Sequence, residues 1–193
     1  MWPWEHLALS YLVASVGYRL VSGRAPTPLT VFAIGVASQL PDLIDKPLAW
    51  GLDILPSGLT LGHSLFFATA VSAVALTLAA RRRRLPLGVA FTLAYGAHLL
   101  GDVLFALLTS GSLAISFLFW PVVPASPDPG VGLLARVGQL AGRFWQFLAT
   151  PRGQLYLGFE LLLLTSAVVL WVVDGRPGLR LVGRRLFGVP NQR

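Results

Sequence analysis

Three long apolar segments limit what this chain can fold into. Residues 61–80, 86–109 and 155–173 meet or approach the roughly 20 residues that a helix needs to cross a bilayer core of about 30 Å. The 193 residues are 55% hydrophobic and only 12% charged, about half the charged share of a soluble globular domain. The mean hydropathy is +0.70. We therefore expect an all-α, polytopic helical membrane protein.

Two shorter helices are expected before these segments, over residues 5–20 and 28–40. Thr27 is a typical N-cap, and Pro28 suits the first position of the second helix. Pro41 is expected to end that helix. At about 1.5 Å per residue the second helix reaches roughly 20 Å, which is short for a full crossing. We therefore expect these two helices to form a shallow hairpin.

Two other segments are expected to be embedded without crossing the membrane. Residues 111–124 are apolar but too short to span, which favours a re-entrant or packed helix. Residues 133–148 are amphipathic, as in a helix lying in the membrane interface. Its polar side chains follow one stripe at helical spacing: Arg136, Gln139, Arg143 and Gln146. In total the sequence predicts about four to six membrane-embedded helices plus one interfacial amphipathic helix.

The basic residues predict an orientation in the membrane. The net charge of +7 would suit nucleic-acid binding, but its placement at the ends of apolar segments is typical of cytoplasmic loops. In the expected topology, eleven of the fifteen basic residues lie on one side and four on the other. The eleven are Arg19, Arg24, Arg81–Arg84 and five arginines in residues 176–193; the four are Lys46, Arg136, Arg143 and Arg152. We expect residues 1–175 to form one integral domain of the plasma membrane, residues 176–193 to be a cytoplasmic tail, and no nucleic acid to be bound.

Six ionisable residues lie beside or inside these apolar segments. An isolated imidazole or carboxylate is costly to bury, and the cost falls when a partner or a metal ion takes up its charge. Following the chain through its expected crossings brings all six to one membrane face, which the arginines predict to be the outer one. The six residues are His6, Asp42, Asp45, His63, His98 and Asp102.

The spacing of these residues favours a metal site. His98 and Asp102 are four positions apart on one helix face, and a helical turn could aim Asp42 and Asp45 at the same point. Neutral imidazole and carboxylate suit zinc and, with more oxygens, manganese. Cysteine is absent, so thiolate ligands and disulfides are excluded. The alternative is a hydrogen-bonded polar core, in which the histidines bridge helices and Asp42 merely caps one.

Read together, these motifs resemble a known family. The strings Glu5-His6, Pro41-Asp42-Leu-Ile-Asp45, His63-Ser64 and His98-Leu-Leu-Gly-Asp102 look like those of the membrane-bound, YdjM-like metal-dependent hydrolases. The resemblance covers roughly residues 1–125. Their order is also similar to that in the zinc-dependent phospholipase C and P1-nuclease group, which cleaves phosphodiesters with a cluster of zinc ions.

The second resemblance implies a ligand set. It assigns Asp45, His63, His98 and Asp102 to one ion, and His6 with Asp102 to a second. The chain lacks the second His-x-x-x-Asp/Glu pair of that group. We therefore expect one or two divalent ions rather than three, with zinc preferred over manganese.

These observations predict a metal-dependent hydrolase of a phosphoester bond in a lipid or lipid-linked substrate. A metal would activate water, and Asp42 or Glu160 would act as general base. One alternative is a non-catalytic protein in which a metal holds the helices together. The other is a metal-ion or proton transporter, which the apolar inner halves of residues 61–80 and 86–109 disfavour. The sequence leaves the oligomeric state undetermined.

Overall fold

The computed structural model describes residues 1–179, and this part is helical with no β-strand. The expectation of an all-α fold is confirmed. Residues 180–193, which hold most of the predicted basic tail, lie outside the described part. Six α-helices appear in residues 1–179: α1 (Pro3–Ser22), α2 (Pro28–Lys46), α3 (Leu65–Arg81), α4 (Leu85–Ser110), α5 (Leu133–Leu148) and α6 (Pro151–Val173). A π-helical turn, η1 (Pro47–Gly51), follows α2, and a 3-10 turn, η2 (Ser116–Phe119), follows α4.

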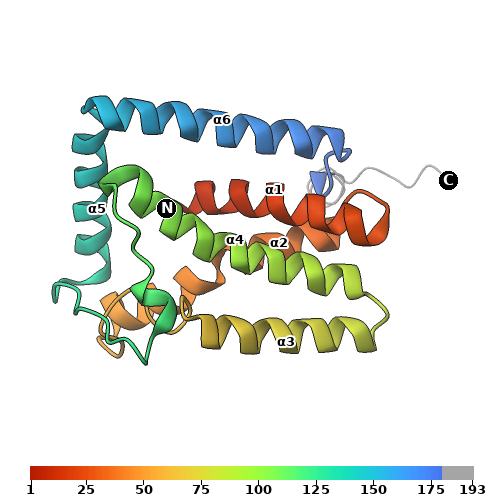
Figure 1. Ribbon diagram of the computed structural model, residues 1–193, viewed down its shortest axis with the longest axis horizontal. Coiled ribbons are helices and arrows are strands. Elements are labelled where there is room, and N and C mark those ends of the chain that lie inside the picture. Colours follow the sequence, from red (N-terminus) through yellow and green to blue (C-terminus); the bar gives the residue numbers. More distant parts are fainter. Residues whose placement is uncertain (180–193) are drawn as a thin grey trace, which may run out of the picture.

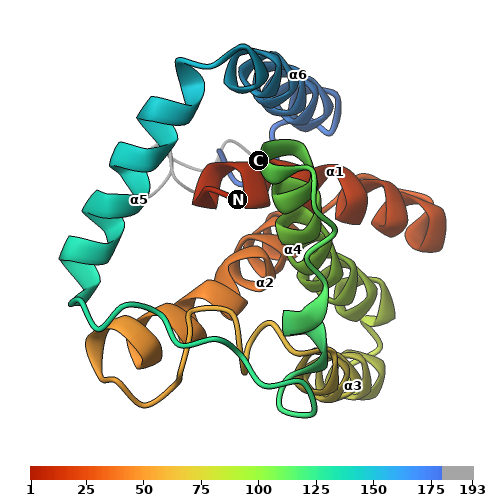
Figure 2. The same ribbon diagram turned by 60° about the vertical axis from the view of Figure 1, so that its left-hand side comes forward.

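Helix α4 is the centre of the bundle. Helices α1, α2 and α3 all pack on it, and α6 packs mainly against α1 (Figures 1 and 2). Small side chains permit this close approach: Ala90 and Ala94 of α4 are fully buried beside Ile34 and Ala37 of α2. Helix α5 runs crosswise to the other helices at one end of the bundle (Figure 1). That end also holds the beginning of α1.

Helix α2 differs from expectation at its C-terminal end. Thr27 caps its start as predicted, since its hydroxyl accepts a hydrogen bond from the amide of Thr30. The prediction that Pro41 ends the helix is wrong, because α2 continues to Lys46. Proline removes one backbone donor from a helix, but the following turn is held by an ion pair from Lys46 to Asp42 and by contacts to the loop before α3. The carboxylates of the Pro41 motif therefore project from a helix, not from a connecting loop.

Two other expected elements are corrected. Helix α3 begins at Leu65, with the Ser64 hydroxyl capping the amide of Phe66, so His63 lies just before the helix rather than in its first turn. Residues 111–124 contain only the short turn η2 where a packed or re-entrant helix was expected. At the start of α3 the side-chain cap prevails over the apolar character of the segment, and no side chain of residues 111–124 is buried.

In the described part of the chain, two helices, α4 and α6, have the length and hydropathy of a membrane span, and α3 is apolar but shorter. Only 22% of the most apolar 18-residue stretch of α6 is buried inside the structure. Its exposed side chains include Leu155, Leu162 and Val173. Large exposed apolar surfaces mark contact with a membrane or a partner, and the amphipathic α5 likewise exposes Leu134 and Trp145.

Candidate metal centre

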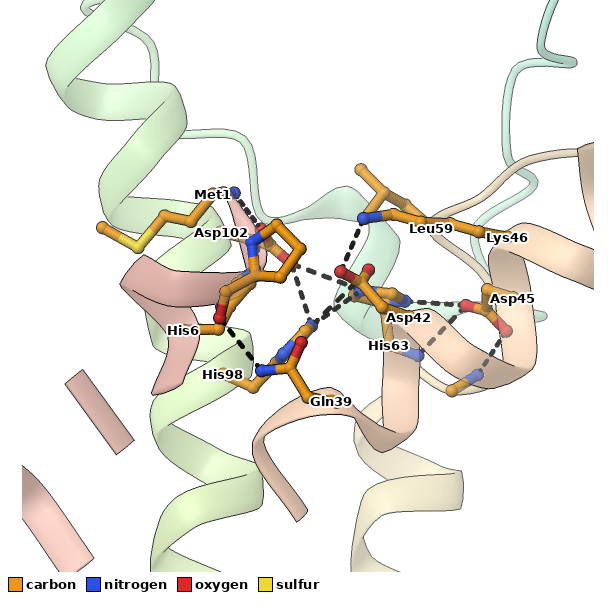
Figure 3. A network of polar contacts seen from close by, with 12 residues as sticks. Met1, His6, Gln39, Asp42, Asp45, Lys46, Leu59, His63, His98 and Asp102 are labelled. Atoms are coloured by element: carbon orange, nitrogen blue, oxygen red, sulfur yellow. Dashed lines mark hydrogen bonds and ion pairs between the residues drawn. The ribbon is translucent and has the colours of Figure 1, made fainter. Parts of the chain in front are cut away.

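The fold brings the six predicted residues together at the end of the bundle where α1 begins (Figure 3). His6 comes from α1, Asp42 and Asp45 from α2, and His98 and Asp102 from α4, while His63 lies in the turn before α3. His6, Asp45, His63 and His98 are fully buried, and the carboxylates of Asp42 and Asp102 are about a tenth exposed.

The hydrogen bonds of two histidines determine which ring nitrogen carries a proton. Nδ1 of His98 lies 2.6 Å from the backbone carbonyl of Ser38, which can only accept, so this nitrogen donates. Nδ1 of His63 donates in the same way to Asp45 Oδ2 at 2.7 Å. Both remaining Nε2 atoms then face each other at 3.1 Å. Two nitrogen lone pairs at this distance repel unless a proton or a cation lies between them.

Two carboxylate oxygens complete the group around these nitrogens. Oδ2 of Asp102 lies 3.3 Å from His63 Nε2 and 3.4 Å from His98 Nε2. Oδ1 of Asp42 lies 3.4 and 3.9 Å from the same two atoms. A tetrahedron with metal–ligand distances of about 2.0–2.1 Å has edges of about 3.3–3.4 Å. The two nitrogens and the Asp102 oxygen therefore have nearly the spacing of three ligands of a zinc ion, and the Asp42 oxygen lies slightly farther out.

A second group shares Asp102. His6 Nε2 lies 3.3 Å from Asp102 Oδ1, and the His6 ring stacks on His98 with centroids 3.7 Å apart. The amino group of Met1 also contacts Asp102 Oδ1, at 2.7 Å. Both ring nitrogens of His6 and Oδ2 of Asp102 are buried without a hydrogen-bond partner. Buried polar atoms normally have partners, so these orphaned atoms fit a bound cation, and His6, His98 and Asp102 are close enough to share one.

Asp45 lies behind the group and faces away from it. Its oxygens accept hydrogen bonds from the backbone amides of Thr60 and Gly62, both at 2.7 Å, in addition to contacting His63. A carboxylate in this position orients a ligating imidazole and raises its basicity. The sequence predicted Asp45 as a ligand. In the structure its carboxylate contacts Nδ1 of His63, the ring nitrogen that faces away from the other candidate ligands.

The charges around His63 decide its protonation in the metal-free protein. Burial acts to lower the pKa of His63, but the carboxylates of Asp102, Asp42 and Asp45 outweigh it and raise the pKa to about 10. These carboxylates therefore favour a positive charge at Nε2, supplied either by a proton or by a metal ion that replaces it. Lys46 contacts the other oxygen of Asp42 at 2.5 Å and leaves Oδ1 turned toward the group.

Glu160, the second predicted general base, lies in a neighbouring cluster. Its Oε1 accepts a hydrogen bond from the indole of Trp4 at 2.7 Å. The fully buried Glu5 accepts from the hydroxyl of Tyr156 and from the amide of Trp2 beside it. Sequence reasoning missed Glu5, although a carboxylate directly before His6 at the start of an apolar helix was a visible signal.

The fold and the site define a helical protein that has, within residues 1–179, two helices of membrane-span length and a buried His/Asp group that can hold a metal ion. The chain matches the model of the YdjM inner membrane protein family over residues 1–176, and it belongs to that family. The match includes α5 and α6, and so extends well beyond the residues 1–125 that carried the resemblance. No curated protein and no solved structure matches the chain.

Proposed function

We propose that this protein is a membrane-bound, metal-dependent hydrolase of a phosphoester bond in a lipid or lipid-linked substrate. One observation carries the proposal: the Nε2 atoms of His63 and His98 face each other at 3.1 Å, and one carboxylate oxygen each of Asp42 and Asp102 lies within 3.9 Å of both. A buried group of this kind is expensive to maintain without a cation.

The donor set fits one or two divalent ions. His63, His98, Asp42 and Asp102 would hold the first, and His6 with Asp102 the second. A set of imidazole nitrogens and carboxylate oxygens favours zinc, whereas manganese prefers more oxygens. When bound, such an ion supplies an acidified water and a Lewis acid for a phosphoryl oxygen.

The protein's own residues would position and move protons around this ion. Asp45 holds the His63 ring and secures the loop that carries it. Of the two carboxylates predicted as general base, Asp42 is better placed, because its Oδ1 lies within the group while Lys46 neutralises its other oxygen. Glu160 would need to leave Trp4 before it could take part.

The membrane arrangement is proposed from charge and position. We take four to six helices as embedded, with α5 in the interface at the end of the bundle that holds the site (Figure 1). The arginine-rich turn between α3 and α4 lies at the opposite end of these helices. The positive-inside rule then places the site at the outer face and the C-terminus in the cytoplasm. A site buried at this depth suits a lipid that enters sideways from the membrane.

A non-catalytic role is the second candidate, and the same geometry favours it. His63, His98, Asp42 and Asp102 would supply four ligands, as in structural zinc sites, whereas catalytic sites keep one position open. In that case the ion would hold α2, α4 and the turn before α3 together without hydrolysing a substrate.

Elemental analysis of detergent-purified protein tests the metal first. We expect one or two equivalents of zinc or manganese in the wild type, and their loss in His98→Ala and in Asp102→Ala. A wild type that holds no metal after reconstitution would turn the group into a hydrogen-bonded polar core. If metal is present, hydrolysis of phosphodiester and lipid-phosphate substrates decides between the two roles: turnover lost in both variants supports the enzyme, and metal without turnover supports the structural ion.

A further inference from the structure

An apolar groove lies at the other end of the helices from the metal centre. It has a volume of about 550 Å³ and is lined by α2, α3 and α4, within the range of about 300–1,000 Å³ of typical ligand sites. Helices α2 and α3 both pack on α4, which separates them. The apolar lining is Ala33 from α2, Ala75, Leu78 and Ala79 from α3, and Leu87, Gly88 and Phe91 from α4.

Two arginines line the groove where α3 turns into α4. Arg82 is the C-cap residue of α3, and Arg84 is the N-cap residue of α4. The turn is well held, since the amide of Arg82 donates to the Leu78 carbonyl at 3.2 Å and that of Arg84 to the Ala79 carbonyl at 2.8 Å. Both arginines are largely exposed, and no ion pair within residues 1–179 includes them.

The first turn of α4 leaves few amides free for an anion. Pro86 has no N–H group, and the amide of Leu87 donates to the Arg84 carbonyl at 2.9 Å. The positive charge at this point therefore comes from the two guanidinium groups, which adjoin the apolar groove and pair with no acidic side chain within residues 1–179.

We propose that this groove binds an anionic phospholipid, with its phosphate at Arg82 and Arg84 and an acyl chain along Ala33, Ala75 and Phe91. Charge complementarity selects an anion, and the apolar walls select one that carries a hydrocarbon chain. A soluble phosphate would leave the apolar part uncovered, and a zwitterionic lipid brings no net negative charge. The site is separate from the metal centre and does not depend on its chemistry.

Such a lipid would also brace α3. Helix α3 packs on α4 and touches η2, but makes no comparable contact with α2. An acyl chain in the groove would contact α2 and α3 together. A ligand that binds only the folded state raises its apparent stability, so anionic lipid should raise the melting temperature of the protein.

The test uses full-length protein in detergent, with lipid binding measured by native mass spectrometry and stability by thermal unfolding. The probes are phosphatidylglycerol, phosphatidylcholine and glycerol 1-phosphate. The test variant is Arg82→Gln/Arg84→Gln, and Arg81→Gln/Arg83→Gln removes the same charge from residues outside the groove. A third variant, Ala33→Phe, fills the apolar part and leaves every charge in place. Helix content by circular dichroism verifies that each variant is folded.

We expect the wild type and Arg81→Gln/Arg83→Gln to retain phosphatidylglycerol and to be stabilised by it. In Arg82→Gln/Arg84→Gln the affinity should fall about tenfold or more, and Ala33→Phe should lose the same adduct. Phosphatidylcholine should bind more weakly, and glycerol 1-phosphate should not stabilise the protein. Equal losses in the two arginine pairs, unchanged binding in Ala33→Phe, or no retained phosphatidylglycerol would each overturn the proposal, whatever the metal analysis shows.

Discussion

At the residue scale, the properties of the site follow from what lies behind each imidazole. The Ser38 carbonyl and the Asp45 carboxylate each take an Nδ1 proton and so direct Nε2 of His98 and His63 to one point. Neither partner needs to touch a metal. The same residue type therefore has two roles here, since Asp42 and Asp102 line the group while Asp45 supports it.

Replacing Asp45 should weaken metal binding without abolishing it. In Asp45→Asn the ligand atoms remain, but His63 loses its charged partner and the loop loses part of its anchor. Removing such an outer partner costs about 10- to 100-fold in metal affinity. Competition against a fluorescent chelator measures the change, with Asp53→Asn, at an exposed position, as the control. Affinity equal to the wild type would show that Asp45 has no positioning role.

Because two groups of candidate ligands share Asp102, a variant that removes only one group should lose only one of two ions. His6 belongs only to the second group, so His6→Ala should keep the ion between His63 and His98 and lose the other. If the wild type holds two equivalents, elemental analysis of His6→Ala should find one. Loss of all metal in this variant would show that His6 is indispensable to a single shared ion.

At the element scale, the site depends on how closely the loop before α3 approaches α2. A Cβ added to Gly62 would lie 2.8 Å from the backbone oxygen of Pro41 and 2.9 Å from its Cα. Tyr95 of α4 donates to the Gly62 carbonyl from the other side at 2.6 Å. The loop is therefore held between two helices, and His63 follows directly.

Gly62→Ala should displace this loop and reduce metal retention. The clash is with backbone atoms, which cannot rotate away as a side chain can. Gly96→Ala on α4 is the matched control, because a Cβ there meets nothing within 4 Å. Metal content of the two purified variants is the measurement, and equal metal in both would contradict the argument.

Asp128 attaches α5 to the rest of the protein. Its carboxylate accepts hydrogen bonds from the Trp50 indole at 2.9 Å, the Gly58 amide at 2.8 Å and Arg136 of α5 at 2.8 Å. Partial burial alone would raise the pKa of Asp128, but these donors hold it below its usual range. The carboxylate therefore stabilises the fold above the unfolded-state pKa of about 3.9, and this is lost as the pH falls through the lower folded-state pKa.

Asp128→Asn should consequently destabilise the protein in a pH-dependent way. At pH 7 we expect a loss on the order of 1 kcal/mol, since hydrogen bonds to a partly exposed charged group are weakened. The difference from the wild type should begin to shrink as the pH falls below about 4, where the carboxyl of the unfolded state takes up its proton, and should disappear below the lower folded-state pKa. Thermal unfolding in detergent across this range measures it, and a difference independent of pH would contradict the assignment.

At the scale of the whole molecule, the arrangement separates two chemistries. The buried His/Asp group and α5 lie at one end of the helices, and the arginine turn lies at the other (Figure 1). A second buried cluster fastens the bundle near the arginine end, where Asp174 accepts hydrogen bonds from Tyr11, Ser15 and Arg19 of α1. The arginines lie at the opposite end of the helices from the His/Asp group, and this difference between the ends determines how the protein would be oriented in a membrane.

The orientation can be tested because the chain has no cysteine of its own. Ser126→Cys adds a thiol at an exposed position in the loop before α5, and Arg83→Cys adds one in the arginine turn. In sealed right-side-out vesicles an impermeant maleimide should label Ser126→Cys at once and Arg83→Cys only after permeabilisation. The opposite pattern would place the metal centre at the cytoplasmic face.

The sequence by itself determined the helical fold and which residues meet. Apolar segments of span length define where helices lie, and the spacing of His98 and Asp102 puts both on one helix face. Counting the crossings then brings six distant residues to one end, where the structure has them. These features follow from periodicity and segment length, which are properties of the chain alone.

Only the tertiary structure decided the role of each residue. The continuation of α2 through Pro41, the position of Asp45 behind His63 and the pairing of Glu160 with Trp4 all depend on segments far apart in the sequence. The decisive partner of His98 is the backbone carbonyl of Ser38. Every residue carries such a carbonyl, so no sequence pattern marks the one that a folded chain brings to a given ring.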